Sequence, residues 1–220
     1  MHSTYDDRPL RRDAQENRER ILAAARGLFA ELGIDASVEE IATRAGVGMG
    51  TLYRRFPTKD ALVDAIFEEH LDDMATAAAA ALEVDDGWEG LVQYLTFVVH
   101  LQATDRGLTD VVGAQLRTEE RVAQARSRLR PVVQSLIERA QQTGKLRGDV
   151  VYEDISVLLW TTGRVVDATR DIAPRFWQRH LALVVDGLRT QGASPLPQPP
   201  LTAARHRQAM QTFAQQRGRA

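Results

Sequence analysis

The chain has 220 residues, of which 44% are hydrophobic and 26% are charged, values that are ordinary for a globular protein. The absence of cysteine excludes disulfides, thiol catalysis and cysteine-ligated metal sites. A net charge of −2 excludes nucleic-acid binding through bulk charge, so such binding needs a local basic patch. No apolar run approaches the roughly 20 residues of a membrane helix, and the first residues lack the apolar core of a signal peptide. We therefore expect a cytoplasmic protein with no membrane partner.

The N-terminal part of the chain carries a surplus of basic residues, since residues 8–59 hold ten Arg or Lys and seven Asp or Glu. Residues 1–12 are polar and are predicted to form a flexible arm, which is either a loose terminus or a DNA contact. From Asp13 to Leu32 apolar residues recur with a period of 3.6, which predicts an amphipathic helix that Gly33 ends. Its apolar stripe consists of Ile21, Leu22, Ala25, Leu28, Phe29 and Leu32.

Residues 37–56 are typical of two short helices joined by a tight turn. Ser37 and Glu40 have the spacing of a capping box, which predicts that the first of these helices begins at residue 38. Gly46 can adopt the positive φ that ends such a helix, so the turn is expected there. Leu52 and Phe56 lie one helical turn apart and are predicted to face inward. The outward face of the second helix then holds Met49, Gly50, Thr51, Tyr53, Arg54 and Arg55.

This outward face suits a DNA groove. Arginine can form paired hydrogen bonds with guanine or phosphate, and the hydroxyl groups of Tyr and Thr can bind phosphate oxygens. A helical hairpin with a solvated basic face is the alternative. We interpret residues 13–58 as a helix-turn-helix DNA-binding domain.

The remainder of the chain is predicted to be helical. Pro57 ends the second short helix, and Thr58 can cap a helix over residues 59–82. Turn signals then divide the chain into helices at about 88–104, 106–114, 118–143, 152–171 and 174–191. Pro131 is expected to kink or split the third of these helices. No segment has the alternation of a strand, so the prediction is an all-α fold: a three-helix head on a C-terminal bundle of about six helices over 59–191.

The last two predicted helices, 152–171 and 174–191, are apolar on more than one face, so each needs cover on more than one side. Burial in one large core would provide it, but we favour a homodimer in which they meet their symmetry mates as a four-helix bundle. Residues 192–220 follow as a proline-rich linker and a basic tail. The tail is expected to be mobile, with a weak helix carrying Met210 and Phe213, or a secondary contact with DNA or a partner, as alternatives.

Several motifs between residues 21 and 66 match those of a known family in their order and spacing. They include Ala45-Gly46-Val47, Gly50-Thr51-Leu52-Tyr53 and Pro57-Thr58-Lys59, which match without a gap. This segment resembles the TetR family of bacterial transcriptional repressors. The Leu146–Asp154 element (LRGDVVYED) also resembles the approach to the eighth helix in one subgroup of that family. The resemblance implies a ligand-binding and dimerisation domain over 59–191, and a homodimer that binds a palindromic operator in double-stranded DNA.

Individual roles in DNA binding follow from the resemblance alone. Thr51 and Tyr53 would contact phosphate, as would Lys59 beside the N-terminal dipole of its helix. Residues at the positions that read base edges or contact phosphate, or that cap the two short helices, complete the expected set: Ser37, Arg44, Gly48, Met49, Gly50 and Arg54. Gly48 departs from the serine or alanine often found there. Because interior glycine also weakens helices, we expect the recognition helix to be only partly ordered without DNA.

The resemblance also implies a pocket for a small-molecule effector within the C-terminal bundle. Candidate lining residues are Met74, Tyr94, Phe97, His100, Leu101, Leu116, Trp160 and Arg164. Ordinary core packing is the alternative for each of them. A largely apolar or aromatic effector, with or without a negative charge, would suit this set.

Two other classes of protein compete with the regulator. An enzyme would need a catalytic constellation, yet the acidic residues around His70 point around a helix and predict no metal site, and we expect no cofactor and no catalytic residues. A helical adaptor would use the apolar C-terminal helices to bind a different protein without contacting DNA. A homodimer without another partner would favour the regulator.

Overall fold

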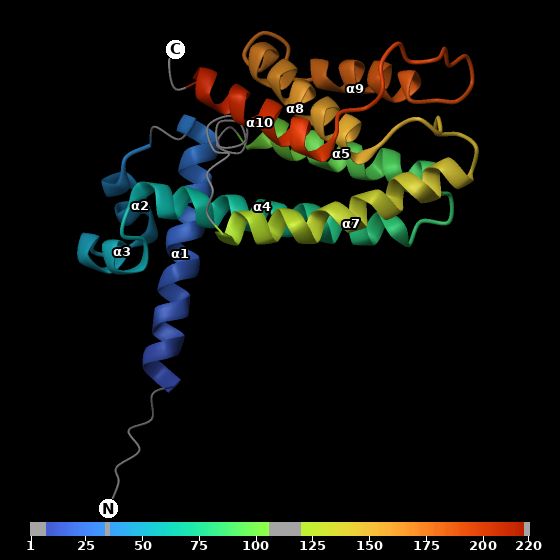
Figure 1. Ribbon diagram of the computed structural model, residues 1–220. Helices are drawn as coiled ribbons and strands as arrows, with labels where there is room; N and C mark the ends of the chain where they lie inside the picture. Colours follow the sequence, from blue (N-terminus) through green and yellow to red (C-terminus); the bar gives the residue numbers. More distant parts are fainter. Residues whose placement is uncertain (1–7, 34–35, 106–119, 218–220) are drawn as a thin grey trace, which may run out of the picture.

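The computed structural model describes residues 8–33, 36–105 and 120–217 (Figure 1). Within these residues the chain is helical and contains no β-strand, only one isolated antiparallel bridge between Leu146 and Arg189. The prediction of an all-α fold is therefore confirmed. The helix expected at 106–114 and the start of the one expected at 118–143 lie outside the described residues. No helix in the described ranges combines the length and apolarity needed to cross a bilayer.

The N-terminal head contains α1 (Arg8–Leu32), α2 (Val38–Ala45) and α3 (Met49–Arg55). Helix α1 begins at Arg8, so the arm predicted for residues 1–12 is too long. Nothing in residues 8–12 opposes a helix, because Pro9 lies in the first turn, where the missing N–H group has no partner to lose. In Figure 1 the head lies at one end of the molecule, away from the bundle.

The turn between α2 and α3 forms as the sequence predicts. The Ser37 hydroxyl accepts a hydrogen bond from the Glu40 amide at 3.1 Å, and the Glu40 carboxylate accepts one from the Ser37 amide at 3.1 Å. Gly46 has φ 63° and ψ 38°, the left-handed conformation that closes α2. Leu52 and Phe56 are buried, which orients α3 so that its other face is open.

Helix α4 (Lys59–Leu82) joins the head to the bundle. The Thr58 hydroxyl caps its N-terminus by accepting a hydrogen bond from the Ala61 amide at 3.0 Å. Its first part packs against α1, and its remaining length packs most extensively against α7 (Glu120–Gln142). One rigid element therefore belongs to both the head and the bundle.

The bundle is completed by α5 (Gly87–Thr104), α8 (Tyr152–Thr169) and α9 (Phe176–Gly187). Helix α5 approaches the end of α4 closely, because a Cβ atom on Gly90 would lie 2.4 Å from the carbonyl oxygen of Ala81. Pro131 does not split α7, which continues through it as one helix. Its side chain is exposed, so water can hydrogen-bond to the carbonyl group that lacks its usual donor.

The chain leaves α9 in a fixed position. The Thr190 amide donates to the carbonyl oxygen of Lys145 at 2.8 Å, and the Arg147 amide donates to that of Leu188 at 3.1 Å. The Arg147 guanidinium also donates to the carbonyl oxygen of Ser194 at 2.7 Å. The loop between α7 and α8 thus anchors the beginning of the proline-rich segment.

The C-terminal segment differs from the sequence-based expectation. Residues 195–200 are not helical, as their prolines require, but α10 (Ala203–Arg217) follows them and packs against the bundle. The His206 side chain is buried, and its Nε2 lies 3.0 Å from the Ser156 hydroxyl oxygen on α8. Figure 1 shows α10 lying along the face formed by α8 and α5. The expected mobile tail is therefore docked from its first turn.

Candidate nucleic-acid interface and ligand cavity

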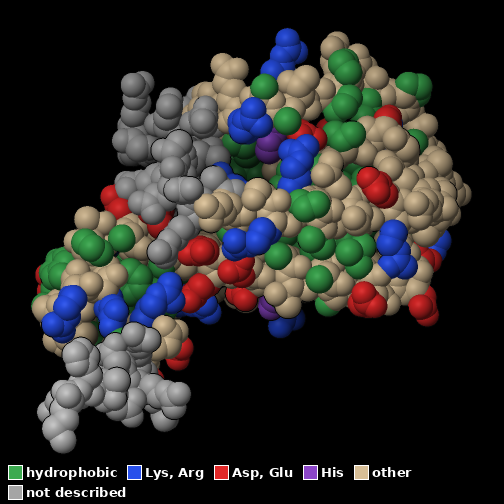
Figure 2. All heavy atoms as spheres, turned by 60° about the horizontal axis from the view of Figure 1, so that its bottom comes forward, with side chains coloured by type: hydrophobic (Ala, Val, Ile, Leu, Met, Phe, Trp, Pro, Cys, Tyr) green, Lys and Arg blue, Asp and Glu red, His purple; other side chains and the backbone are tan. Residues whose placement is uncertain are grey.

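The outward face of α3 is open and polar. Leu52 anchors the helix in the core, while the side chains of Tyr53, Arg54 and Arg55 are exposed, with 45% of Tyr53 accessible. Gly50 is also exposed and leaves open space where a larger side chain would stand. Figure 2 shows Lys and Arg side chains gathered on the head, at the lower left of that view. Such a surface can bring backbone and guanidinium groups close to DNA.

The other predicted DNA-binding residues lie around this helix. Lys59 is half-buried at the start of α4, Met49 packs against the core, and Gly48 caps α3 without a side chain. The Thr51 hydroxyl accepts a hydrogen bond from the Arg54 guanidinium at 3.3 Å. Ser37 has a structural function at the start of α2. The predicted residues thus lie on or beside α2, on α3 with its N-cap, and at the start of α4.

Arg44, predicted to contact DNA, is held by another residue. Its two terminal nitrogens lie 2.9 and 3.0 Å from the two carboxylate oxygens of Glu31 on α1. The hydrogen bond from Arg44 is the main reason that the pKa of Glu31 falls below its ordinary value. The same pair raises the pKa of Arg44. Arg44 must exchange this partner before it can bind phosphate through the same nitrogens.

Two basic residues of the head were not predicted from the sequence. The Arg20 guanidinium donates to the carbonyl oxygen of Gly46 at 3.1 Å, which supports the turn between α2 and α3. Arg18 lies over the ring of Phe56, 5.9 Å from its centroid. Arg20 on α1 thus contacts the turn, and Arg18 contacts the residue that ends α3. The spacing of the two arginines in the sequence does not predict either contact.

A cavity of about 460 Å³ lies inside the C-terminal bundle. Helices α4, α5, α7, α8 and α10 all contribute to its wall, and its size is within the range of small-molecule sites. Figure 2 shows a hollow in the bundle with basic side chains and a histidine at its rim. The lining residues are Phe67, Leu71, Met74, Tyr94, Val98, Gln102, Arg126, Ser127, Leu129, Arg130, Val133, Tyr152, Ile155, Ser156, Leu159, Trp160, His206, Arg207 and Met210.

Three of the eight predicted pocket residues line this cavity: Met74, Tyr94 and Trp160. Burial raises the pKa of Tyr94 far above its ordinary value, so the phenol stays protonated. Leu116 lies outside the described residues. The other four predicted residues are not in the cavity wall.

Phe97, His100 and Leu101 do not line this cavity, because it meets another face of α5. Tyr94, Val98 and Gln102 point inward at intervals of four residues, and the predicted residues lie beside that line. Phe97 is 38% exposed. His100 is exposed and packs against Trp177, with ring centroids 6.1 Å apart.

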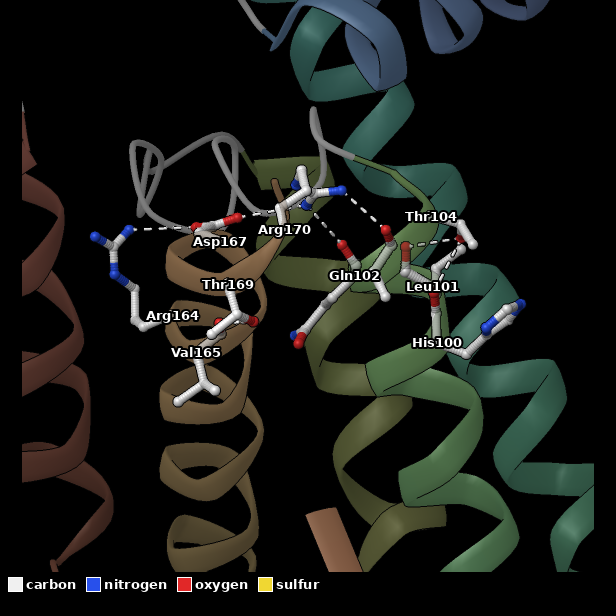
Figure 3. Close-up of polar contacts among 10 residues, drawn as sticks. His100, Leu101, Gln102, Thr104, Arg164, Val165, Asp167, Thr169 and Arg170 are labelled. Carbon is white, nitrogen blue, oxygen red and sulfur yellow. Dashed lines mark hydrogen bonds and ion pairs between the residues drawn. The ribbon is translucent and has the colours of Figure 1, made fainter. Parts of the chain in front are cut away.

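Arg164, also predicted for the pocket, is exposed and lies 3.4 Å from Asp167 on its own helix. Asp167 further pairs with Arg170 at 3.5 Å. Figure 3 shows that the Arg170 guanidinium reaches the end of α5, where it donates to the carbonyl oxygens of Ala103 at 2.8 Å and Gln102 at 3.2 Å. These contacts tie the C-terminal ends of α5 and α8 together, outside the cavity.

The acidic residues around His70 do not form a metal site within the described residues. Glu69 pairs with Arg26 on α1, and Asp72 pairs with Arg128 on α7 at 2.9 Å. The Nε2 atom of His70 lies 3.1 Å from a carboxylate oxygen of Asp105, without the alignment of a hydrogen bond. Neighbouring acidic residues on α4 therefore pair with basic residues on different helices.

The fold and the head define a helix-turn-helix transcriptional regulator with a separate helical domain. Residues 21–66 match the family of bacterial regulatory proteins described as the tetR family, and residues 86–190 match the C-terminal domain described as SbtR-like. The TetR transcription regulatory protein of Mycobacterium vanbaalenii is 35% identical, with 83% of this chain and 100% of that chain covered and a TM-score of 0.60. The chain belongs to the TetR family of regulators.

Two further relatives agree with this assignment. A TetR transcriptional regulator of Streptomyces coelicolor is 30% identical, with 78% of this chain and 98% of that chain covered and a TM-score of 0.59. An HTH-type transcriptional regulator of Staphylococcus aureus is 44% identical over 68 residues, which are 30% of this chain. That match spans 37% of the length of the Staphylococcus protein.

Proposed function

We propose that this regulator is a repressor that binds a palindromic operator as a homodimer and is released by a small-molecule effector. The observation that carries this proposal is the position of α4. It begins with Lys59 in the head and continues to Phe67, Leu71 and Met74 in the cavity wall. A ligand that changes the position of α4 also changes the position of α3, because both pack against the same core.

Release then follows from differential binding. The effector favours the arrangement in which the two heads of the dimer are wrongly spaced for successive major grooves. By linkage, operator DNA lowers the affinity for effector by the same factor. Repression itself follows from occupancy, because a dimer on a promoter blocks polymerase.

Exposed apolar side chains on the last bundle helices support the homodimer. Phe176 is 41% exposed and Leu183 is 61% exposed, both on α9, and Leu158 and Val165 on α8 are partly buried. Large apolar side chains in contact with water favour association. We expect Leu183→Glu to give a monomer by light scattering, whereas Arg128→Gln, on the surface of α7, leaves the dimer intact.

Footprinting on the DNA upstream of the protein's own gene, across a salt series, tests the DNA-binding part. We expect a protected palindrome whose affinity falls steeply with salt and is lost in the double variant Tyr53→Ala/Arg54→Ala. Arg128→Gln is the matched control, since it removes a basic residue of α7, outside the head. If neither this DNA nor random-site selection yields a bound sequence, the proposal is wrong. A monomer that binds no DNA would instead favour the helical adaptor.

A further inference from the structure

The cavity has a polar end that is unevenly charged. The positive charge of Arg130 is compensated there, because its guanidinium lies 2.6 Å from the Glu153 carboxylate. It also stacks over the Tyr152 ring, 4.5 Å from the centroid. Burial raises the pKa of Tyr152 above its ordinary value, so its hydroxyl group keeps a proton to donate. Arg130 and Glu153 together bring little net charge to the cavity.

Arg126, one turn earlier on α7, lacks such compensation. Its guanidinium lies over the Phe67 ring, 5.3 Å from the centroid, and within the described parts of the chain no carboxylate pairs with it. Burial lowers the pKa of Arg126, because a guanidinium that is partly removed from water loses hydration of its charge. A negative group in the cavity would restore the lost stabilisation through paired, charge-assisted hydrogen bonds.

Helix α10 provides the last part of this polar end. Besides the contact between His206 and Ser156, it brings Arg207 and Met210 to the cavity wall. The guanidinium groups of Arg126, Arg130 and Arg207 lie close enough to His206 to interact with it electrostatically. The lining therefore holds three arginines, one of which pairs with Glu153 behind it, and the rest of the lining is mainly apolar.

We infer that the cavity binds an amphipathic organic acid, whose carboxylate contacts Arg126 and whose apolar body lies against Leu71, Met74 and Val98, with α10 as a wall of the same site. This inference rests on the proposed ligand-responsive function. A single carboxylate fits better than a phosphate dianion, because Glu153 neutralises Arg130 and Arg207 is exposed to solvent, which leaves the charge of the half-buried Arg126 to be balanced. The planar guanidinium of Arg126 also matches a carboxylate in shape.

Calorimetric titration with octanoate, decanoate and phenylacetate tests the charge requirement, with the corresponding amides as neutral matches. We expect at least one carboxylate to bind, and its amide to bind about ten- to a hundredfold more weakly, the equivalent of one charge-assisted hydrogen bond. Arg126→Met should weaken the carboxylate by a similar factor and leave the amide unchanged. Arg128→Gln, on the same helix but paired with Asp72, should change neither.

Three outcomes would overturn the inference: no carboxylate binds, acid and amide bind equally, or Arg126→Met keeps the preference for the acid. Tighter binding of decyl phosphate than of decanoate would assign the site to a dianion instead. Operator binding is measured separately. If the acid binds without releasing DNA, the proposed effector response fails while the ligand class stands. If only neutral compounds release DNA, the ligand class fails while the regulator stands.

The contribution of α10 has its own test in this cysteine-free chain. Met210→Cys introduces one thiol in the cavity wall, and Gln208→Cys places one on the exposed side of the same helix. Saturating carboxylate should slow maleimide modification of the first thiol at least severalfold and leave the second unchanged. Equal rates at Met210→Cys with and without the acid would remove α10 from the site.

Discussion

Arg44 and Glu31 form a bidentate ion pair that joins α2 to α1, with nitrogen–oxygen distances of 2.9 and 3.0 Å. Both side chains are substantially exposed, so the pair forms where DNA phosphate is expected to approach. The carboxylate competes with phosphate for the same guanidinium nitrogens. We therefore expect Glu31 to oppose DNA binding while it orders the head.

Glu31→Gln should therefore strengthen operator binding severalfold. Arg44 becomes available for one additional phosphate contact, so the slope of log affinity against log salt should become steeper by about 0.9. Fluorescence anisotropy with labelled operator at several salt concentrations measures both quantities. Glu39→Gln on α2 is the control for charge, since it changes the head by the same amount without freeing Arg44. Equal effects of the two substitutions would show that Arg44 does not bind phosphate.

Two glycines of the head should respond to alanine with opposite signs. Gly46→Ala places a side chain at φ 63° and should lower the free energy of unfolding by about 1–2 kcal/mol. Gly50→Ala lies within α3 in open space and should raise it by about 0.8–1 kcal/mol. Urea denaturation without DNA measures both.

The same Gly50→Ala variant tests the expectation of partial order in α3. Amide exchange across residues 48–55 should slow in this variant without DNA, and it should slow in the natural sequence when operator binds. Equally strong protection of these amides in the free and bound natural protein would contradict that expectation.

Acid should weaken the docking of α10. Burial is the main reason that the pKa of His206 lies below its ordinary value of 6.5; Arg130, Arg126 and Arg207 lower it further, and Glu153 opposes them. Above 6.5 the imidazole is neutral whether α10 is docked or released. Below 6.5 the released or unfolded form takes up a proton that the docked form resists, so stability falls as the pH drops through the lowered pKa.

Urea denaturation at about pH 7.5 and 5.5 measures this loss of stability. His206→Gln should lose less stability on acidification than the natural sequence does. Ser156→Ala serves as the control, since it removes the hydrogen-bond partner but keeps the buried imidazole that titrates. If His206→Gln and the natural sequence lose stability equally, His206 does not link acid to the docking of α10.

The close approach of α5 to the end of α4 should make Gly90 intolerant of a side chain. Gly90→Ala would place a Cβ atom 2.4 Å from the Ala81 carbonyl oxygen, so two backbones must separate. We expect a loss of about 1–3 kcal/mol in the free energy of unfolding, as for overpacked sites. Gly148→Ala, where a Cβ atom meets nothing within 4 Å, should change stability by no more than about 0.5 kcal/mol. Similar effects at both positions would contradict the close packing.

The head was predictable because its signals are local. The capping box of Ser37 and Glu40 spans one helical turn, and Gly46 marks the reversal by its own conformational freedom. The cavity was predicted less well, since the apolar residues of α5 occupy more than one face. Choosing between Val98 and Phe97 depends on where α7 and α8 lie, which periodicity alone does not specify.

The C-terminal segment shows the same limit more clearly. The prolines correctly predicted a break in helical structure, but the docking of α10 depends on a contact between His206 and Ser156, 50 residues apart. Arg126 was missed for a related reason. In the sequence it is one of 26 arginines. Its guanidinium differs from the others only because the cavity walls partly remove it from water.

The fixed exit of the chain from α9 has a consequence for how often the cavity is covered. The loop containing Lys145 and Arg147 holds residues 188–194, so only a short proline-rich tether separates that anchor from α10. A tether of this kind keeps an attached segment at an effective concentration of about millimolar. Helix α10 can therefore cover the cavity most of the time even if its intrinsic affinity is weak. The fraction of time that α10 covers the cavity does not depend on the protein concentration. An incoming ligand competes with a segment of the same chain, whose effective concentration stays constant.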